Sequence, residues 1–149
     1  QEWPVVDATL RDTGFHWSST IIWAKDTLVL SRKDYHTQYE PIWYGWNDKA
    51  SRLINVKDRK QSDVWNIQRP KKSELHPTTK PVELIEKAIN NSTEASGRVI
   101  DFFGGSGSTL IAAEKTGRTC NSMELDPKYV DVIVKRWEDF TGNKAELLN

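Results

Sequence analysis

The sequence has 149 residues, which fits one domain of ordinary size. It carries 21 Lys and Arg against 21 Asp and Glu, and this zero net charge excludes a uniformly basic nucleic-acid coat and an acidic disordered tail, though not a local basic patch. The single cysteine, Cys120, excludes an internal disulfide and favours a reducing setting. Since no apolar run approaches the ~20 residues of a membrane helix and nothing resembles a signal peptide, we expect a cytoplasmic protein without membrane contact.

Hydrophobic periodicity predicts the elements in chain order. A helix is expected over residues 4–11, an alternating aromatic strand over 15–23, and a second aromatic strand over 39–46, antiparallel to the first. Pro41 places the second strand at a sheet edge or beside a bulge. The second half predicts a helix over 81–90, a strand over 99–103, a helix over 108–116, a strand over 119–123 and a helix over 127–140. The four elements from residue 99 form a βαβα unit, which requires parallel strands.

The two halves differ in chemistry. Six of the seven tryptophans lie before residue 66, and residues 47–72 hold eight Lys and Arg against three Asp. Such a basic segment is either a solvated loop or a surface that follows phosphates.

Three glycines lie within four residues, at Gly104, Gly105 and Gly107, between a predicted strand and a predicted helix. A turn of this kind lets the backbone approach a ligand closely and directs amides toward it. Glu124 follows the next strand, where a carboxylate can accept both hydroxyls of a ribose. NAD and S-adenosylmethionine (SAM) share that ribose; Leu110 occupies the third glycine position of a dinucleotide fingerprint, which weakens the NAD alternative.

Several motifs carry a resemblance to a known family. Asp-Phe-Phe-Gly-Gly-Ser-Gly-Ser-Thr at 101–109 resembles the SAM-binding motif of DNA amino-methyltransferases, which methylate adenine N6 or cytosine N4. His-Pro-Thr-Thr-Lys-Pro at 76–81 resembles the second SAM motif of their β-class, in which the catalytic motif precedes the SAM motifs. Met-Glu-Leu-Asp-Pro-Lys-Tyr at 123–129 resembles the acidic loop that follows. Weaker matches at residues 23–25, 39–41 and 63–65 extend the resemblance over residues 14–142.

The resemblance implies a SAM-dependent DNA methyltransferase of restriction-modification systems or phages. It implies that Asp101, Phe102 and Gly104 surround the methionine part of SAM, that Glu124 holds the ribose, and that Leu125 covers the adenine. Thr78 and Lys80 are expected to meet the methionyl carboxylate, for which a hydroxyl and a cation are suitable partners. The implied cofactor residues are, in full, Thr78, Lys80, Asp101, Phe102, Gly104, Gly105, Ser106, Gly107, Glu124 and Leu125.

The catalytic motif of the family, Asp/Asn/Ser-Pro-Pro-Tyr/Phe, is missing, because the sequence contains no Pro-Pro dipeptide. That motif accepts the hydrogen bonds of the target amine and stacks on a flipped base. Asp-Pro-Lys-Tyr at 126–129 imitates it, but Asp126 before Pro127 is typical of a helix N-cap. We therefore expect no catalytic residue in this chain. The family order would place the catalytic strand upstream of residue 1, so a preceding segment or a partner chain is expected to supply it; a homodimer is a further arrangement.

The partner expected for the complete protein is DNA. Candidates for the walls of a base pocket are Trp43, Tyr44 and Trp46, with Tyr35 and His36 nearby. Candidates for phosphate contacts are Lys49, Arg52, Lys57, Arg59 and Lys60. No His, Cys and acidic cluster has metal-ligand spacing.

The expected fold is α/β, a Rossmann-like SAM-dependent methyltransferase fold in the circularly permuted β-class order, incomplete because the strand of the catalytic motif is absent. We expect a single partial domain, with an aromatic strand pair over 1–46, a basic linker over 47–75 and a SAM-binding βαβα part over 76–149. Two alternatives stay open: a non-catalytic SAM- or DNA-binding module, and the nucleotide-binding domain of an oxidoreductase. The choice between adenine and cytosine also stays open.

Overall fold

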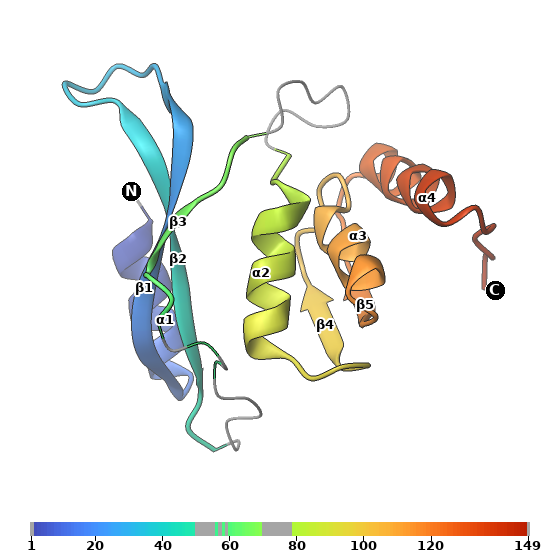
Figure 1. Cartoon of the computed structure of the whole chain (residues 1–149), viewed down its shortest axis with the longest axis horizontal. Helices are drawn as coiled ribbons and strands as arrows, with labels where there is room; N and C mark the ends of the chain where they lie inside the picture. Colours follow the sequence, from blue (N-terminus) through green and yellow to red (C-terminus); the bar gives the residue numbers. More distant parts are fainter. Residues whose placement is uncertain (1, 50–55, 57, 59, 70–78, 149) are drawn as a thin grey trace. The chain divides into compact units, whose positions relative to one another are not determined.

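The computed structural model describes residues 2–49, 56, 58, 60–69 and 79–148, and the chain divides into two compact units, Gln1–Gln68 and Arg69–Asn149. We describe each unit by itself. Figure 1 labels the helices and strands.

Unit 1 contains helix α1 (Trp3–Asp12) and strands β1 (Phe15–Val29), β2 (Thr37–Asn47) and β3 (Val64–Asn66). β1 is the central strand, antiparallel to β2 and parallel to β3 (Figure 1). β2 lies at the edge of this sheet, which confirms the position inferred from Pro41, since an edge strand tolerates the missing backbone donor. The register shifts between Trp17 and Ser19, where β1 carries an irregularity that the sequence did not predict.

The buried residues of unit 1 are aromatic and aliphatic side chains near β3. Trp23 and Trp65 are opposite one another in the parallel register of β1 and β3, and both are buried. The indole Nε1 of Trp23 donates to the carbonyl of Ile67 at 2.7 Å, so the polar atom of a buried ring has its partner. Two tryptophans therefore define this small core, in agreement with the concentration of tryptophan in the first half.

Unit 2 contains helix α2 (Val82–Ser92), strand β4 (Arg98–Asp101), helix α3 (Ser108–Lys115), strand β5 (Thr119–Ser122) and helix α4 (Pro127–Thr141). β4 and β5 are parallel and joined through α3, as the βαβα pattern predicted. Ile89, Ala112 and Ala113 form the core between α2 and α3, with Val99 and Cys120 of the sheet packed against it. The small alanines of α3 allow α2 and α3 to lie side by side (Figure 1).

The differences from the predicted elements are small but informative. β4 ends at Asp101, two residues before the predicted end, because the chain turns there into the glycine loop. β3 was not predicted, since three residues within a basic segment show no periodicity. On α4, the helical spacing of Val130, Ile133 and Val134 predicts one inward face, but only Ile133 is buried and the two valines are about two-fifths exposed.

In the described residues, no strand of unit 1 pairs with a strand of unit 2, so the two sheets are separate. Among the described helices, none combines the length and apolar character needed to cross a membrane.

Candidate functional site

The glycine loop follows β4 and leads into α3. Its path is fixed by backbone bonds: the Gly104 N–H donates to the Met123 carbonyl at 2.8 Å, and the Gly107 N–H donates to the Gly104 carbonyl at 2.8 Å. The carboxylate of Asp101 accepts a bond from the Phe103 N–H at 3.0 Å. The loop therefore continues the pairing of β4 with β5 past the end of the sheet. It also holds the side chain of Asp101 at the carboxyl end of β4.

Glycine is required in this loop for two different reasons. A Cβ on Gly104 would lie 2.5 Å from Ser122 Oγ and 3.0 Å from Ile133 Cδ1, so the backbone is as close to β5 and α4 as it can be. Gly105 and Gly107 have φ of +55° and +78°, a conformation that other residues adopt at a cost. The clustered glycines thus reflect close packing on one side of the loop and left-handed turns along it.

Glu124 lies just after β5, and its carboxylate is held by two backbone amides. Gly105 N–H donates to Oε2 at 2.7 Å and Asp126 N–H donates to Oε1 at 3.0 Å. Each carboxylate oxygen has a second lone pair, so the group can still accept bonds from a ligand. The structure therefore holds an oriented acceptor at the carboxyl end of β5.

The segment before α2 also contacts the loop and the start of α3. Thr79 Oγ1 lies 3.2 Å from Ser106 Oγ, and Ser108 Oγ donates to the Lys80 carbonyl at 2.9 Å. Ser106 and Ser108 are both buried. These bonds bring Lys80 and Glu124 to the same cavity although they are far apart in the sequence.

The cavity between these segments has a volume of about 310 Å³, within the range of small-molecule sites. It is open at the carboxyl ends of β4 and β5, where ligands bind in α/β sheets. It is lined by Thr79, Lys80, Ile85, Asp101, Phe103, Gly104, Gly105, Ser106, Ser108, Thr109 and Glu124.

Six of the ten predicted cofactor residues line this cavity: Lys80, Asp101, Gly104, Gly105, Ser106 and Glu124. Gly107 is buried and does not line it, and Phe102 and Leu125 are exposed and do not line it either. Thr78 lies outside the described residues. The cavity adds Thr79, Ile85, Phe103, Ser108 and Thr109, none of which was singled out; Ser108 and Thr109 were detectable as the first turn of the helix that follows the glycines.

The three aromatic candidates of β2 do not form one slot. Trp43 Nε1 donates to Asp7 of α1 at 2.9 Å, and its ring meets Phe15 edge-on. Tyr44 and Trp46 lie together, 6.2 Å between ring centroids, and Trp46 also contacts His16. Since successive residues of a strand point to opposite faces, Trp43 is separated from the other two.

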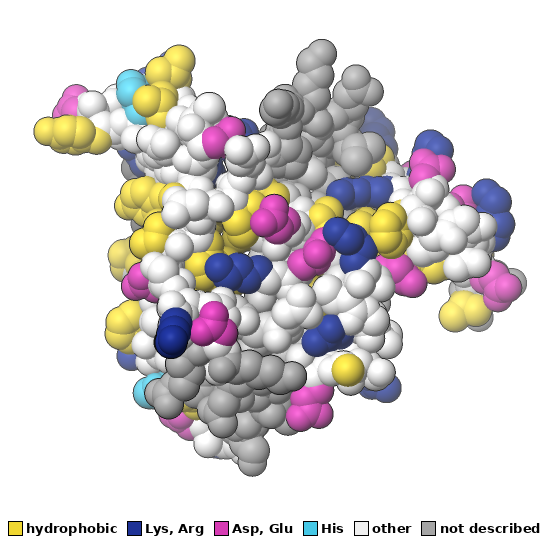
Figure 2. Space-filling model, in the orientation of Figure 1, with side chains coloured by type: hydrophobic (Ala, Val, Ile, Leu, Met, Phe, Trp, Pro, Cys, Tyr) yellow, Lys and Arg dark blue, Asp and Glu magenta, His cyan; other side chains and the backbone are white. Residues whose placement is uncertain are grey.

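Of the basic candidates, Lys49 and Lys60 are exposed, while Arg52, Lys57 and Arg59 lie outside the described residues. Tyr35 and His36 lie between β1 and β2, and both are exposed. On the face of the molecule that Figure 2 draws, Lys and Arg are interspersed with Asp and Glu among the coloured residues.

Asp126 is the N-cap of α4. Its side chain accepts a bond from the Lys128 N–H at 3.0 Å, and Pro127 occupies the first turn. This geometry confirms the prediction that the Asp-Pro-Lys-Tyr segment is a helix start.

The cavity offers a fixed carboxylate, a second carboxylate, a lysine and backbone amides. A ligand that matches this set carries hydroxyl donors, a cation and an anion on one small framework. SAM has all three, as a ribose, an ammonium beside a sulfonium, and a carboxylate. In the described part of the chain, no group of three or more His, Cys, Asp and Glu is arranged to hold a metal ion.

The comparisons with known proteins all indicate the same family. A model of the DNA methylase family matches residues 4–135. The chain is 32% identical to the type II methyltransferase M2.LlaDCHI of Lactococcus lactis subsp. cremoris over 88% of its length and 54% of that protein. It is also 32% identical to M2.DpnII of Streptococcus pneumoniae, over 89% of the chain and 55% of that protein. The crystal structure of the M1.HpyAVI–SAM complex aligns with a TM-score of 0.78 and 26% identity, covering 91% of this chain and 68% of that one. The chain spans about half the length of the curated relatives it matches.

Proposed function

This chain belongs to the N6/N4 DNA methylase family, and from that premise we propose that it is the cofactor-binding part of a SAM-dependent DNA methyltransferase of the restriction-modification type. The complete protein would methylate adenine N6 or cytosine N4 in DNA, in the cytoplasm. The observation that carries the proposal is the amide-held carboxylate of Glu124, which lines the cavity together with Lys80.

The residues of the cavity have distinct parts in this proposal. Glu124 accepts the two ribose hydroxyls, Asp101 faces the positively charged methionyl group, and Lys80 pairs with its carboxylate. Gly104 lets the loop pack closely against β5 and α4, and Gly105, whose Cβ position is nearly open, presents its backbone to the ligand without a side chain. When bound, SAM supplies a methyl group activated by its sulfonium. The chain's own residues orient that group, and no covalent nucleophile is needed for transfer to an amine.

We propose further that a segment with the Pro-Pro motif, from a preceding part of the protein or a partner, completes the site. Three observations support this: the sequence has no Pro-Pro dipeptide, the chain spans about half of its relatives, and β4 pairs with β5 alone among the described strands. An unpaired parallel strand edge in the middle of a fold of this class favours pairing with a further strand.

The test of cofactor binding is a calorimetric titration of the chain with SAM, with NAD as the alternative ligand. We expect saturable SAM binding and no NAD binding. Glu124→Gln keeps the size of the side chain but removes the charge, and we expect SAM affinity to fall at least tenfold, about 1.4 kcal/mol or more.

Glu114→Gln is the matched control, because Glu114 is an exposed glutamate of the same unit that accepts a bond from Trp137 Nε1 and does not line the cavity. Its SAM affinity should equal that of the unmodified chain. Binding of NAD in preference to SAM, or equal affinities for Glu124→Gln and the unmodified chain, would contradict the proposal.

A further inference from the structure

Arg136 of α4 contacts the glycine loop and the start of α3. Its Nη1 donates to the Ser106 carbonyl at 2.9 Å and to Ser108 Oγ at 3.2 Å, with a longer contact to Ser106 Oγ at 3.4 Å. Ser106 and Ser108 both line the cavity, whereas Arg136 does not. One guanidinium nitrogen thus contacts the last part of the loop and the first residue of α3.

This arrangement is unfavourable for stability alone. Arg136 is partly buried, burial lowers the pKa of its guanidinium, and among the described residues no carboxylate lies within ion-pair distance of it. Its charge also lies at the amino end of α3, where the helix dipole disfavours a cation. An unpaired, partly buried charge that persists at such a place points to a geometric requirement of the neighbouring site.

The chemistry of these hydrogen bonds fixes which group donates and which accepts in each of them. A guanidinium can only donate, so Ser108 Oγ is an acceptor toward Arg136. The single hydroxyl proton of Ser108 is then available for the Lys80 carbonyl, which it reaches at 2.9 Å. Arg136 therefore orients Ser108, and Ser108 holds the backbone of Lys80 beside the cavity.

We propose that Arg136 is a positioning residue of the cofactor site, which acts through Ser106 and Ser108 to hold the Lys80 side of the cavity against the glycine loop. This rests on the proposed function for the identity of the ligand. Because Lys80 is assigned to the methionyl carboxylate and Glu124 to the ribose, the effect of Arg136 should fall on the amino-acid end of SAM.

Arg118 provides a matched control within the same unit. It is also a partly buried arginine, and it binds the Thr93 carbonyl at 3.0 Å, Thr93 Oγ1 at 3.2 Å and the Thr116 carbonyl. These contacts tie the end of α2 to the end of α3, and neither Thr93 nor Thr116 lines the cavity. A methionine at either position removes the same donors, but only one of the two changes is connected to the site.

The first measurement is hydrogen exchange of the full chain without ligand. In Arg136→Met, amides of the glycine loop and of residues 79–84 should exchange at least tenfold faster, and Arg136→Lys should restore part of the protection. Arg118→Met should accelerate exchange near Thr93 and Thr116 and leave the loop unchanged. Unchanged exchange of the loop in Arg136→Met would overturn the proposal.

The second measurement compares two ligands by calorimetry. SAM should bind Arg136→Met about tenfold more weakly, as for the loss of one charge-assisted hydrogen bond. Methylthioadenosine, which has the ribose but no amino-acid end, should bind that variant with unchanged affinity, whereas Glu124→Gln should weaken both ligands.

The comparison of the two ligands distinguishes a positioning role of Arg136 from a general loss of structure in the variant. Equal weakening of SAM and methylthioadenosine by Arg136→Met, or equal effects of Arg136→Met and Arg118→Met on SAM, would overturn the proposal. Failure of the unmodified chain to bind either ligand would contradict the proposed function instead, and the exchange experiment would still decide the structural part of the inference.

Discussion

Gly104 is the residue where the loop, β5 and α4 approach most closely. A Cβ at this position would meet Ser122 Oγ at 2.5 Å, Ile133 Cδ1 at 3.0 Å and the Met123 carbonyl at 3.2 Å. Its φ is not in the left-handed region, so the requirement for glycine here is steric and not conformational. The close approach is what allows the Gly104 N–H to bond the Met123 carbonyl and extend the sheet.

We expect Gly104→Ala to lower the free energy of unfolding by about 1–3 kcal/mol, the usual cost of forcing an atom into a packed contact. Ser122→Ala removes the nearest atom, so the double variant Gly104→Ala/Ser122→Ala should recover part of the loss, and Ser122→Ala alone should be close to neutral. Urea denaturation of the four proteins measures this coupling. Strict additivity of the two changes would show that the loop moves away from β5.

Single residues differ in how far the sequence alone could assign them. The glycines and Glu124 were predictable, because their spacing follows from the turn and the strand that carry them. Arg136 was not, since a charged residue on a helix shows no pattern that tells a solvated lysine or arginine from one that binds a loop. Leu125 was expected to cover the adenine. Its side chain is almost fully exposed in this chain, and the contact with adenine stays a prediction for the protein with SAM bound.

Among the elements, those with strong periodicity and defined ends were predicted to within a few residues. α4 is an example, because Asp126 and Pro127 mark its start and Gly142, with φ of +73°, follows its end. β1 and β2 were longer than predicted, since their outer residues are too polar to continue the alternation. β3 depends on pairing with β1 from a distant part of the chain, which local patterns do not record.

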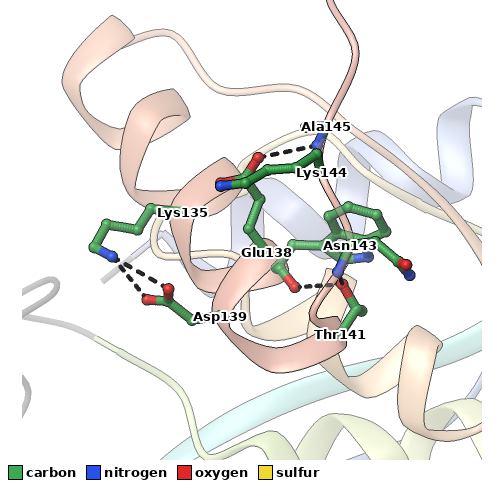
Figure 3. A network of polar contacts seen from close by, with 8 residues as sticks. Lys135, Glu138, Asp139, Thr141, Asn143, Lys144 and Ala145 are labelled. Carbon is green, nitrogen blue, oxygen red and sulfur yellow. Dashed lines mark hydrogen bonds and ion pairs between the residues drawn. The ribbon is translucent and has the colours of Figure 1, made fainter.

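The end of α4 is fastened by a group of polar contacts (Figure 3). Glu138 accepts a bond from the Ala145 N–H at 3.0 Å and pairs with Lys144 at 3.0 Å, so the chain after Gly142 folds back onto the helix. The Ala145 bond first, and Lys144 second, lower the pKa of Glu138 below the ordinary glutamate value. Lys135 and Asp139 form a separate pair on the same helix.

We expect these contacts to depend on pH in one direction. Because the pKa of Glu138 is lowered in the folded chain, the tether is complete at neutral pH and is lost as the pH falls through that lowered pKa. The Ala145 amide resonance, followed by NMR from neutral to acidic pH, should shift in that range, and Glu138→Gln should abolish the shift. Asp139→Asn should leave the Ala145 titration unchanged; a loss of the shift in that variant would assign it to another carboxylate.

The whole chain consists of two units with separate sheets and about half the length of its relatives. All lining residues of the cavity described above belong to unit 2, so the proposed cofactor binding depends on residues of one unit. In the proposed function, methyl transfer to the target amine also needs the Pro-Pro motif, which this sequence does not contain. Binding and methyl transfer should therefore be separable.

We expect the chain alone to bind SAM and to transfer no methyl group to DNA. Addition of the proposed segment that carries the Pro-Pro motif, produced separately, should restore transfer, measured as incorporation of labelled methyl groups. Glu124→Gln in the restored mixture should reduce incorporation at least tenfold at limiting SAM, whereas Glu114→Gln should not. Methylation by the chain alone would contradict the division of roles proposed for the two parts.

Cys120 lies on β5, packed against the core of α2 and α3, and it is the single thiol of the sequence. Burial, and then the charge of Asp101, raise the pKa of this thiol, so little thiolate is present at neutral pH. Cys120 is partly buried, so an alkylating reagent should react slowly while β5 is packed and faster when β5 separates from its neighbours. The rate of alkylation at Cys120 thus reports on the opening of the strand that precedes Glu124, and a ligand bound in the cavity should lower this rate.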